Sequence, residues 1–269
     1  MKKKTKILLV IPARYASSRL PGKPLCYLEG TKNIKKTLIE RTWLLAQSLK
    51  ITCKIVIATD DDRIENFSKD FGAEVIMTSE KCKNGTERVA EVVKKIDESF
   101  DIIVNLQGDA LLTPTWFIEE TIKNFSESHS EVVTPIMKCD EVLFKNMKKN
   151  FRNGVTGGTT VAVNHLNQAM YFSKSLIPYI NNHEIKSFRN INIFFHVGVY
   201  CYSQKVILKY PKLKKSFYEK TEGLEQLRFL YNDIRISCVK VKTKESEIWE
   251  LNNKSDIPII EKILKKRGM

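Results

Sequence analysis

A basic loop near the N-terminus has the residue types and spacing for binding a polyphosphate. It follows the apolar run Ile7–Ile11 and contains Arg14, Arg19 and Lys23, together with Gly22 and three prolines. Guanidinium and ammonium groups donate charge-assisted hydrogen bonds to phosphates, and glycine lets backbone N–H groups come close to them. The loop does not have the glycine spacing of a Walker A motif or of a dinucleotide-binding motif. A solvated basic turn is the alternative interpretation.

One carboxylate has a position that complements this loop. Asp109 comes shortly after the apolar run Ile102–Leu106, in the segment Gln107-Gly108-Asp109. A carboxylate at the carboxyl end of a central strand is well placed to hold Mg²⁺ against nucleotide phosphates. The alternative is an ordinary Asx-type turn into the next helix. A cationic loop combined with such a carboxylate is what nucleotidyl transfer requires.

Three further groups of polar residues carry weaker signals. Asn84–Arg88 is a turn leading into a helix, and its N–H groups and the Arg88 guanidinium could meet a base, a ribose or a phosphate. His196 lies in an apolar strand, where a lone histidine is more often a core residue than a ligand. The third group is expected to form a solvated face of one helix: Glu222, Glu225, Gln226 and Arg228.

Alternating strands and helices must position these candidates. Apolar runs of strand length occur at Ile7–Ile11, Lys54–Ala58, Ala73–Met77, Ile102–Leu106 and Val132–Ile136. Helical patterns lie between them, at Ile34–Ser48, Asp62–Phe71, Thr86–Ile96 and Pro114–Phe125. This order predicts an α/β fold, a mostly parallel sheet with helices on both faces, which binds ligands at the carboxyl ends of its strands. The basic loop and Asp109 are therefore expected at one edge of the sheet.

The pattern changes after about Phe144. Short strands are expected at Thr159–Val163, Ala169–Ser173, Ile193–Tyr200 and Ile236–Lys240. Helices are expected from about Ser203, at Thr221–Tyr231 and at Ser255–Lys266. No repeat or low-complexity linker interrupts the chain. We therefore expect a single domain over residues 1–269, with an excursion at about 138–218 that covers the site.

The composition favours anionic partners. The formal net charge is +14, and 42% of the residues are hydrophobic, enough for a sizeable core. The lysines are scattered, and no RNA-binding aromatic motif or zinc-finger spacing accompanies them, so nucleic acid is not the expected partner. A basic protein that coats nucleic acid stays open as a second class of function. The six cysteines form no Cys-x-x-Cys pair and no segment has the length of a membrane span, which predicts free thiols in a soluble, cytoplasmic protein without membrane insertion.

Taken together, these segments resemble the CMP-Kdo synthetases (3-deoxy-manno-octulosonate cytidylyltransferases), where Kdo is 3-deoxy-manno-octulosonate. The resemblance runs from about residue 7 to 260, and the sequence IPARYASSRLPGKPL at Ile11–Leu25 is its most specific motif. The other motifs follow in the same order along the chain: Ala58–Asp61, Gly85–Arg88, Val104–Asp109, Tyr171–Ser173, His196–Tyr200 and Leu224–Arg228.

The resemblance implies a Rossmann-like nucleotidyltransferase fold and, usually, a homodimer. It implies an enzyme that uses CTP and Mg²⁺ to activate an acidic sugar, Kdo above all, for lipopolysaccharide biosynthesis. The implied catalytic residues are Arg14, Lys23 and Asp109, and the implied nucleotide-binding residues are Ala13, Arg14, Ser17, Lys23, Arg88 and Gln107. The implied sugar-acid-binding residues are Arg19, His196, Tyr200, Glu225 and Gln226, and the implied metal ligand is Asp109.

The chain departs from the family pattern at three positions. Ala110 follows Asp109 where the family has Glu, and Thr160 stands where the family commonly has Lys. Asn252 stands where the family has a second metal carboxylate, and an amide oxygen can coordinate but brings no charge. Glu250 could substitute if its side chain swings in. Two alternatives therefore stay open: activation of a different acid (an amino-Kdo, another ulosonic acid or a phosphonate), or a nucleotide-binding homologue with impaired catalysis.

Overall fold

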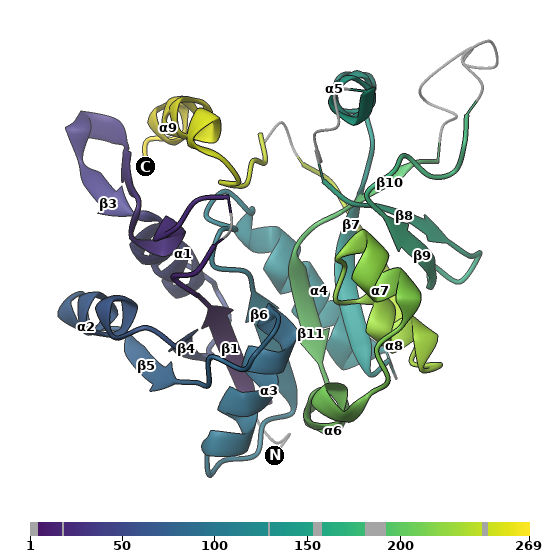
Figure 1. Ribbon diagram of the computed structural model, residues 1–269, viewed down its shortest axis with the longest axis horizontal. Coiled ribbons are helices and arrows are strands. Elements are labelled where there is room, and N and C mark those ends of the chain that lie inside the picture. The colour runs from purple at the N-terminus through teal and green to yellow at the C-terminus, as the bar shows by residue number, and fades with distance from the viewer. Residues whose placement is uncertain (1–4, 18, 129, 153–157, 181–191, 244–246) are drawn as a thin grey trace.

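The computed structural model describes residues 5–17, 19–128, 130–152, 158–180, 192–243 and 247–269 (Figure 1). Its main feature is a ten-stranded mixed sheet. Nine of its strands follow one another in the order β5 (Glu74–Met77), β4 (Lys54–Thr59), β1 (Ile7–Pro12), β6 (Ile102–Leu106), β11 (Val199–Tyr202), β7 (Val132–Lys138), β10 (Phe194–His196), β8 (Thr160–Val163) and β9 (Ala169–Ser173). The tenth strand, β12 (Ile236–Val241), pairs with β7.

The first half of the sheet is parallel, as the sequence predicts. β1 pairs in parallel with β4 on one side and with β6 on the other, and β5 extends the parallel set beyond β4. The carboxyl ends of β1 and β6 therefore lie side by side. This arrangement brings the basic loop after β1 and the Asp109 turn after β6 to the same edge of the sheet.

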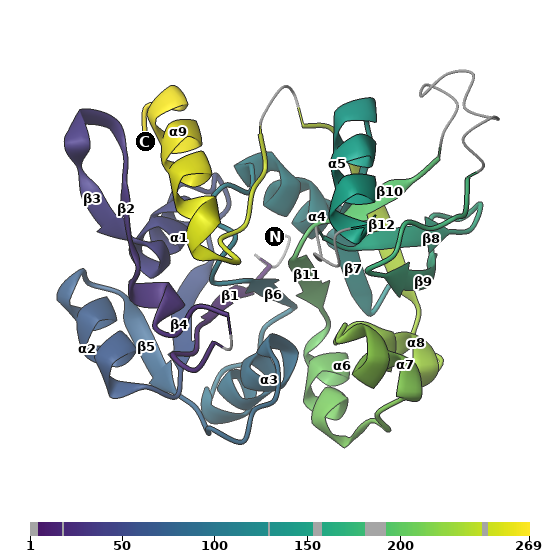
Figure 2. The same cartoon turned by 45° about the horizontal axis from the view of Figure 1, so that its top comes forward.

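Helices cover both faces of this half, and the alternation along β1 shows which side chains face which layer. Leu8 and Val10 pack in the core with the helices α3 (Gly85–Lys95), α6 (Gln204–Lys209) and α8 (Leu227–Tyr231). Leu9 and Ile11 pack in the opposite core with α1 (Leu38–Gln47), α2 (Asp62–Asp70) and α4 (Thr115–Glu127). The buried β1 side chains thus fix the two helical layers on either side of the sheet, which Figure 2 shows from a second direction.

The second half of the sheet is mixed, and here one predicted strand is wrong. The segment Ile193–Tyr200 forms two strands, β10 and β11, with a sharp turn in which Val199 N–H donates to the Val197 carbonyl at 2.7 Å. β10 pairs with β7 and β8, whereas β11 pairs with β6 and β7. The turn therefore lets one apolar segment join two parts of the sheet, which no local pattern indicates.

Two predicted helices also differ from the structure: one begins later than expected, and the other is divided in two. The helix predicted at Ile34–Ser48 begins only at Leu38, because the Thr37 side chain caps α1 and the residues before it pair in a hairpin of β2 (Tyr27–Glu29) and β3 (Lys35–Thr37). The helix predicted at Thr221–Tyr231 is interrupted. It is replaced by α7 (Phe217–Glu222) and α8, which Gly223 separates with a left-handed φ of 62°.

The C-terminal helix α9 (Ile257–Lys266) ties the ends of several distant segments together. Its buried residues Ile260, Ile263 and Leu264 form a separate apolar cluster beside β2. That cluster takes in Leu28 of β2 and Leu38 of α1, together with residues of the basic loop, of the turn after β6 and of the segment before α9: Leu20, Leu111, Leu112 and Leu251. Packing of α9 therefore holds the loops that carry the candidate site residues.

The remaining predictions have simple outcomes. The helix α5 (Glu141–Arg152) falls where the sequence shows only a change of pattern after Phe144. Residues 153–157 and 181–191 of the predicted excursion lie outside the described residues, as does Ser18 of the loop motif. The six cysteines are free thiols, as predicted. No helix in the described part of the chain is long and apolar enough to cross a membrane.

Candidate active site

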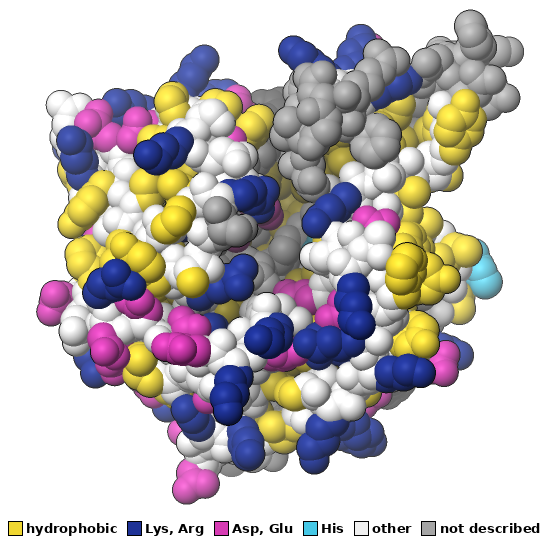
Figure 3. Space-filling view, viewed as in Figure 1, with side chains coloured by type: hydrophobic (Ala, Val, Ile, Leu, Met, Phe, Trp, Pro, Cys, Tyr) yellow, Lys and Arg dark blue, Asp and Glu magenta, His cyan; other side chains and the backbone are white. Residues whose placement is uncertain are grey.

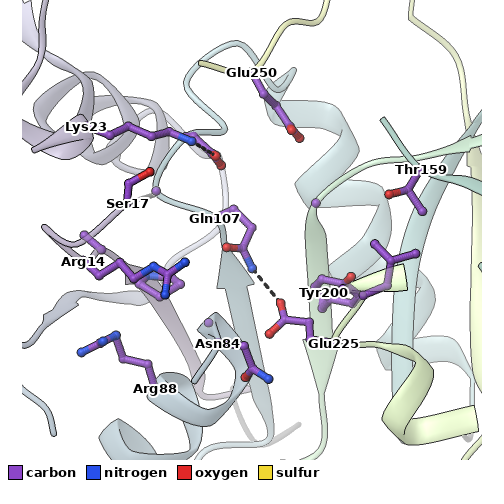
Figure 4. A pocket seen from close by; sticks show the side chains of 18 of the residues that line it. Arg14, Ser17, Lys23, Asn84, Arg88, Gln107, Thr159, Tyr200, Glu225 and Glu250 are labelled. Carbon is purple, nitrogen blue, oxygen red and sulfur yellow. Dashed lines mark hydrogen bonds and ion pairs between the residues drawn. The ribbon is translucent and has the colours of Figure 1, made fainter. Parts of the chain in front are cut away.

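The candidate residues gather around a cleft of about 480 Å³ at the carboxyl ends of β1 and β6. Figure 4 looks into this cleft, and Figure 3 shows Lys and Arg side chains around the hollow at the centre of the same face of the molecule. Twelve residues named from the sequence line it: Ala13, Arg14, Ser17, Arg19, Lys23, Arg88, Gln107, Asp109, His196, Tyr200, Glu225 and Gln226. Glu222, Arg228 and Asn252, which were also singled out from the sequence, do not line it.

The basic loop is held in a compact fold by its own backbone. Ala13 N–H donates to the Ala58 carbonyl at 2.8 Å, which continues the pairing of β1 with β4. Gly22 adopts a left-handed φ of 70°, and its N–H donates to the Tyr15 carbonyl at 2.9 Å. A side chain at Gly22 would also press on the Tyr15 ring, which the Arg63 guanidinium covers from 3.4 Å. The loop is therefore preorganised, with its cationic side chains at the cleft.

The turn after β6 brings Asp109 against this loop. The Gly108 backbone passes so close to β1 that an added Cβ would lie 2.7 Å from the Pro12 carbonyl oxygen. Thr42 in α1 donates its hydroxyl to the Gly108 carbonyl at 2.9 Å and so fixes the turn from the other side. As a result the Asp109 carboxylate forms an ion pair with the Lys23 ammonium group (Figure 4).

Arg88 is placed at the floor of the cleft by the N-terminus of α3. The Asn84 side chain caps that helix by accepting from Glu87 N–H at 2.8 Å. The Arg88 side chain is only 3% exposed; it donates to Thr78 and forms an ion pair with Asp60 at 2.6 Å. Because these partners fix the guanidinium, Arg88 can present its remaining donors to a ligand in one orientation.

Glu225 connects the two sides of the cleft, and the prediction that it lies on a solvated helix face is wrong. Gly223 ends α7, so the chain turns and Glu225 reaches the cleft from a non-helical segment. Its carboxylate accepts from Thr86 N–H at 2.9 Å and from Gln107 Nε2 at 3.2 Å (Figure 4). Burial raises the pKa of Glu225. The hydrogen bond also fixes the Gln107 amide, whose oxygen stays available as an acceptor.

Two other members of that predicted solvated face, Arg228 and Glu222, are structural, whereas Gln226 lines the cleft. Arg228 is completely buried, pairs with Glu219 at 2.5 Å and donates to Glu87 at 2.9 Å. Glu222 accepts from the Ser173 hydroxyl at 2.7 Å and so ties α7 to β9. Tertiary packing after the break at Gly223 overrides the helical pattern, because α8 is turned so that Arg228 points into the protein.

His196 is both a core residue and part of the cleft wall. It is 7% exposed, and burial lowers its pKa to about 3, so the ring is neutral at physiological pH. The Thr134 hydroxyl donates to the Val199 carbonyl at 2.7 Å, so it must accept from His196 Nε2 at 2.9 Å. The ring proton is therefore on Nε2, and Nδ1 is an acceptor. The ring of Tyr200 lies 5.2 Å from that of His196.

Glu250 lines the cleft without any change of its side chain. Figure 4 shows its carboxylate directed into the cleft. Burial, and then the charge of Asp109, raise the pKa of Glu250 to about 7. The side chain of Asn252 instead accepts from Arg19 Nη2 at 2.9 Å. Of these two residues, Glu250 lines the cleft and Asn252 does not.

The other two departures from the family pattern lie away from the cleft. Ala110 is buried in the core on the α1 and α4 side of the sheet. Thr160 is buried in β8, where its hydroxyl donates to the Ser175 carbonyl at 2.5 Å. Neither is among the described residues that line the cleft.

Sequence reasoning missed several residues of the cleft wall. Thr159, Phe195, Gly198 and Leu224 line it although none has an ionisable side chain. Each lies next to a residue or motif that the sequence does single out, so adjacency is the signal that could have found them. The sequence does not show which of the residues next to a predicted site residue faces the cleft. For Phe195 and Gly198, the turn between β10 and β11 decides this.

Comparison with known proteins shows to which family this chain belongs. Residues 8–236 match the cytidylyltransferase family. The chain belongs to this family. It is 36% identical over 265 residues to the 3-deoxy-manno-octulosonate cytidylyltransferase of Maricaulis maris, covering 97% of this chain and 98% of that protein. It is 32% identical over 269 residues to the mitochondrial 3-deoxy-manno-octulosonate cytidylyltransferase of Arabidopsis thaliana, covering 99% of this chain and 86% of that one.

Solved structures agree with this cytidylyltransferase assignment. The structure of CMP:2-keto-3-deoxy-manno-octonic acid synthetase complexed with CTP superposes with a TM-score of 0.81 at 29% identity, covering 98% of this chain and 100% of that one. A 4-diphosphocytidyl-2C-methyl-D-erythritol synthase shares the fold, with a TM-score of 0.61 at 11% identity, over 98% of this chain and 100% of that one. The predicted nucleotidyltransferase fold is therefore confirmed.

Proposed function

We propose that this chain transfers the cytidylyl group of CTP to 3-deoxy-manno-octulosonate, giving the CMP-sugar and pyrophosphate. The observation that carries the proposal is the shared cleft. It brings the preorganised basic loop, Asp109 and the wall formed by His196, Tyr200 and Glu225 together in a chain whose curated relatives bear this name.

The nucleotide occupies the side of the cleft formed by β1, α3 and β6. Arg14, Ser17 and Lys23, with the backbone of Ala13, bind the triphosphate, because they form the preorganised loop and lie at the cleft. Arg88 and Gln107 orient the cytidine, and both are fixed by hydrogen bonds to other protein groups. Positioning and charge stabilisation of this kind supply most of the catalysis in phosphoryl and nucleotidyl transfer.

The carboxylates present fit a magnesium ion. Asp109 and Glu250 both line the cleft, and after burial the charge of Asp109 raises the pKa of Glu250, an effect that a bound cation would relieve. No group of three or more His, Cys, Asp or Glu side chains suited to a metal is found among the described residues, but Mg²⁺ is commonly held by one or two carboxylates together with substrate phosphates and water. A bound Mg²⁺ would neutralise charge on the triphosphate and on the departing pyrophosphate.

The sugar acid occupies the opposite side, beside Arg19, His196, Tyr200, Glu225 and Gln226. Arg19 is the cation available for its carboxylate, and the neutral His196 offers an acceptor at Nδ1. The anomeric hydroxyl oxygen of the acid attacks the α-phosphorus of CTP and loses its proton. The bond between the α-phosphorus and the bridging oxygen breaks, and pyrophosphate leaves. Lys23 and Arg14 stabilise the negative charge that develops on the phosphates.

Measurement of pyrophosphate release tests this proposal. Purified protein with CTP and Mg²⁺ is expected to release pyrophosphate only when Kdo is added, and an amino-Kdo or a phosphonate should be a poorer acceptor. Release with another acid but not with Kdo would correct the substrate. Saturable CTP binding without release for any acid would contradict the enzymatic proposal, and salt-sensitive binding to nucleic acid that ignores CTP would favour the second class of function.

We also propose that two copies of the chain pair through the apolar surface of β8, β9 and α7. Met170, Phe217 and Tyr218 are more than half exposed there, and Figure 3 shows hydrophobic side chains gathered over these elements. A large exposed apolar patch commonly marks an interface. Light scattering should give the mass of a dimer for the wild type and of a monomer for Phe217→Asp. Tyr27→Asp, at another exposed aromatic position, is the control; a monomeric wild type would refute the pairing.

Two further parts of the sequence-based description stay predictions. One is the organisation of residues 1–269 as a single domain whose excursion, at about 138–218, binds substrate and forms the dimer. The other is the cytoplasmic location of the protein.

A further inference from the structure

Two acidic residues follow β4, and they hold two different arginines. Asp60 pairs with Arg88 at 2.6 Å. Asp61 instead caps α2, and its carboxylate accepts from the backbone N–H groups of Arg63 and Ile64 at 3.0 and 3.4 Å. Ile64 is completely buried, so the first turn of α2 is fixed against the core. The second of these arginines, Arg63, does not line the cleft.

The Arg63 side chain folds back onto the carboxylate that caps its own helix. Its Nε donates to Asp61 Oδ1 at 3.0 Å, and its Nη2 donates to Asp61 Oδ2 at 2.6 Å. Two parallel hydrogen bonds fix the plane of a guanidinium as well as its position, so this plane is set although 60% of the side chain is exposed. The pair is also neutral, and Arg63 therefore adds little repulsion to the cations of the basic loop.

The fixed guanidinium lies against Tyr15 of the basic loop. Its central carbon is 3.4 Å from the centre of the Tyr15 ring, which is direct contact and well inside the reach of a cation–π interaction. The Tyr15 side chain also lies against Gly22, where an added Cβ would be only 3.1 Å from it. The Tyr15 carbonyl accepts from Ser17 N–H at 2.8 Å and from Gly22 N–H at 2.9 Å. Tyr15 is therefore the residue around which the loop closes, and Arg63 holds its ring.

The basic loop needs such support because it carries its cations close together. Arg14, Arg19 and Lys23 belong to one short loop, where their charges repel one another. A contact that fixes the closed loop in advance lowers the conformational entropy that is lost when an anion binds. The stack of Arg63 on Tyr15 is a contact of this kind, and it comes from a separate element, α2.

We propose that Arg63 is a positioning residue: Asp61 holds its guanidinium against the Tyr15 ring, and this contact keeps the basic loop in the closed form that binds a triphosphate. The inference rests on the proposed function only in taking a triphosphate as the ligand of the loop. The two acidic residues after β4 then each act on the nucleotide by way of one arginine. Asp60 acts on the cytidine by way of Arg88, and Asp61 acts on the triphosphate by way of Arg63.

Hydrogen exchange of the Gly22 amide, followed by nuclear magnetic resonance in the ligand-free protein, measures closure of the loop directly. Calorimetric titrations with inorganic tripolyphosphate and with cytidine, both with Mg²⁺ present, separate binding at the loop from binding of the base. The variants are Arg63→Ala, Asp61→Asn, Tyr15→Leu and the double variant Arg63→Ala/Tyr15→Leu. Asp61→Asn keeps an oxygen that can cap α2 but loses the charged two-point pairing with Arg63. Lys69→Ala is the matched control, because it removes the same charge from another exposed position of α2.

The expected effects are confined to the loop and are non-additive. Arg63→Ala should speed exchange of the Gly22 amide and weaken tripolyphosphate binding, each about two- to fivefold, which corresponds to the loss of one exposed cation–π contact. Asp61→Asn should act in the same direction by a smaller factor. Tyr15→Leu should have at least the effect of Arg63→Ala, and the double variant should equal Tyr15→Leu, because Arg63 acts through the ring. Cytidine binding should stay the same in every variant, and Lys69→Ala should match the wild type.

Three results would overturn the proposal. Unchanged Gly22 exchange or unchanged tripolyphosphate binding in Arg63→Ala would mean that the stack does not hold the loop. An equal loss of tripolyphosphate binding in Lys69→Ala would mean that only the charge of α2 matters. Cytidine binding that weakens as much as tripolyphosphate binding would mean that Arg63 supports the fold as a whole, which thermal unfolding of each variant checks separately.

The exchange measurement also separates this inference from the proposed function. Because it uses the ligand-free protein, it tests whether Arg63 and Tyr15 hold the loop even if the proposed reaction is wrong. A wild type that binds tripolyphosphate but releases no pyrophosphate from CTP with any acid would refute the proposed function and not the positioning role of Arg63.

Discussion

The two walls of the cleft are built in different ways. We call Arg14, Lys23 and Arg88 the cationic wall, and Glu225 and Glu250 the acidic wall. In the cationic wall, Arg14 and Lys23 come from the basic loop that directly follows β1, with Arg14 exposed, whereas the buried Arg88 comes from the first turn of α3. The acidic wall comes from the break between α7 and α8 and from the segment before α9, and burial raises the pKa of both of its carboxylates.

This difference shows that the two walls depend on different interactions. A triphosphate carries several negative charges, so a preorganised loop of cations at a sheet edge suffices to bind it. On the acidic wall, a charge is tolerated only where directed hydrogen bonds support it, as Thr86 N–H and Gln107 support Glu225. We therefore expect substitutions on the cationic wall to act mainly through lost charge, and those on the acidic wall through lost geometry.

Removing the Lys23 charge should give the largest effect. Lys23→Met is expected to lower kcat/KM for CTP on the order of 10²–10³-fold, because a preorganised donor to the phosphates is lost. Initial rates of pyrophosphate release provide the measurement. Lys35→Met, at an exposed position in β3, should be neutral. A Lys23→Met enzyme with nearly wild-type kcat/KM would show that the cationic wall does not work through this charge.

Arg88 should give a smaller, mixed effect because it is buried. Arg88→Met is expected to raise the KM for CTP about tenfold and to lower the free energy of unfolding by about 2 kcal/mol, since Asp60 and Thr78 lose their partner. Denaturant unfolding and CTP titration measure the two quantities separately. If stability falls while CTP binding is unchanged, Arg88 supports the fold and does not belong to the cationic wall.

His196, which lies beside the acidic wall, should give the smallest effect, one seen in the pH dependence of stability. Its folded-state pKa of about 3 is below the usual value in an unfolded chain, so only the unfolded state takes up a proton as the pH falls below about 6.5. The contribution of His196 to the free energy of unfolding is complete above that pH and should be smaller by about 2 kcal/mol at pH 5.

His196→Gln should therefore lose less stability between pH 7 and pH 5 than the wild type does, as chemical unfolding at each pH would show. His165→Gln removes an exposed histidine at the turn between β8 and β9 and should follow the wild type. An unchanged pH dependence in His196→Gln would mean that the ring is accessible to protons in the folded state.

The sequence by itself determined the parallel half of the fold and the cationic wall. Alternation in β1, the runs of β4 and β6 and the loops that follow them are local features, and parallel strands necessarily bring their carboxyl ends together. For this reason the sequence alone places Arg14, Lys23 and Asp109 at one edge of the sheet.

Only the tertiary structure decided the acidic wall. The turn at Val197–Gly198, the break at Gly223 and the orientation of Glu250 all depend on which distant segments pack together. Leu251 is buried under α9 and Arg19 reaches Asn252 across 233 positions of the chain, so distant segments set the place of Glu250 in the cleft wall. Sequence patterns report local periodicity, whereas burial and charge at these residues come from contacts between segments that only the folded chain brings together.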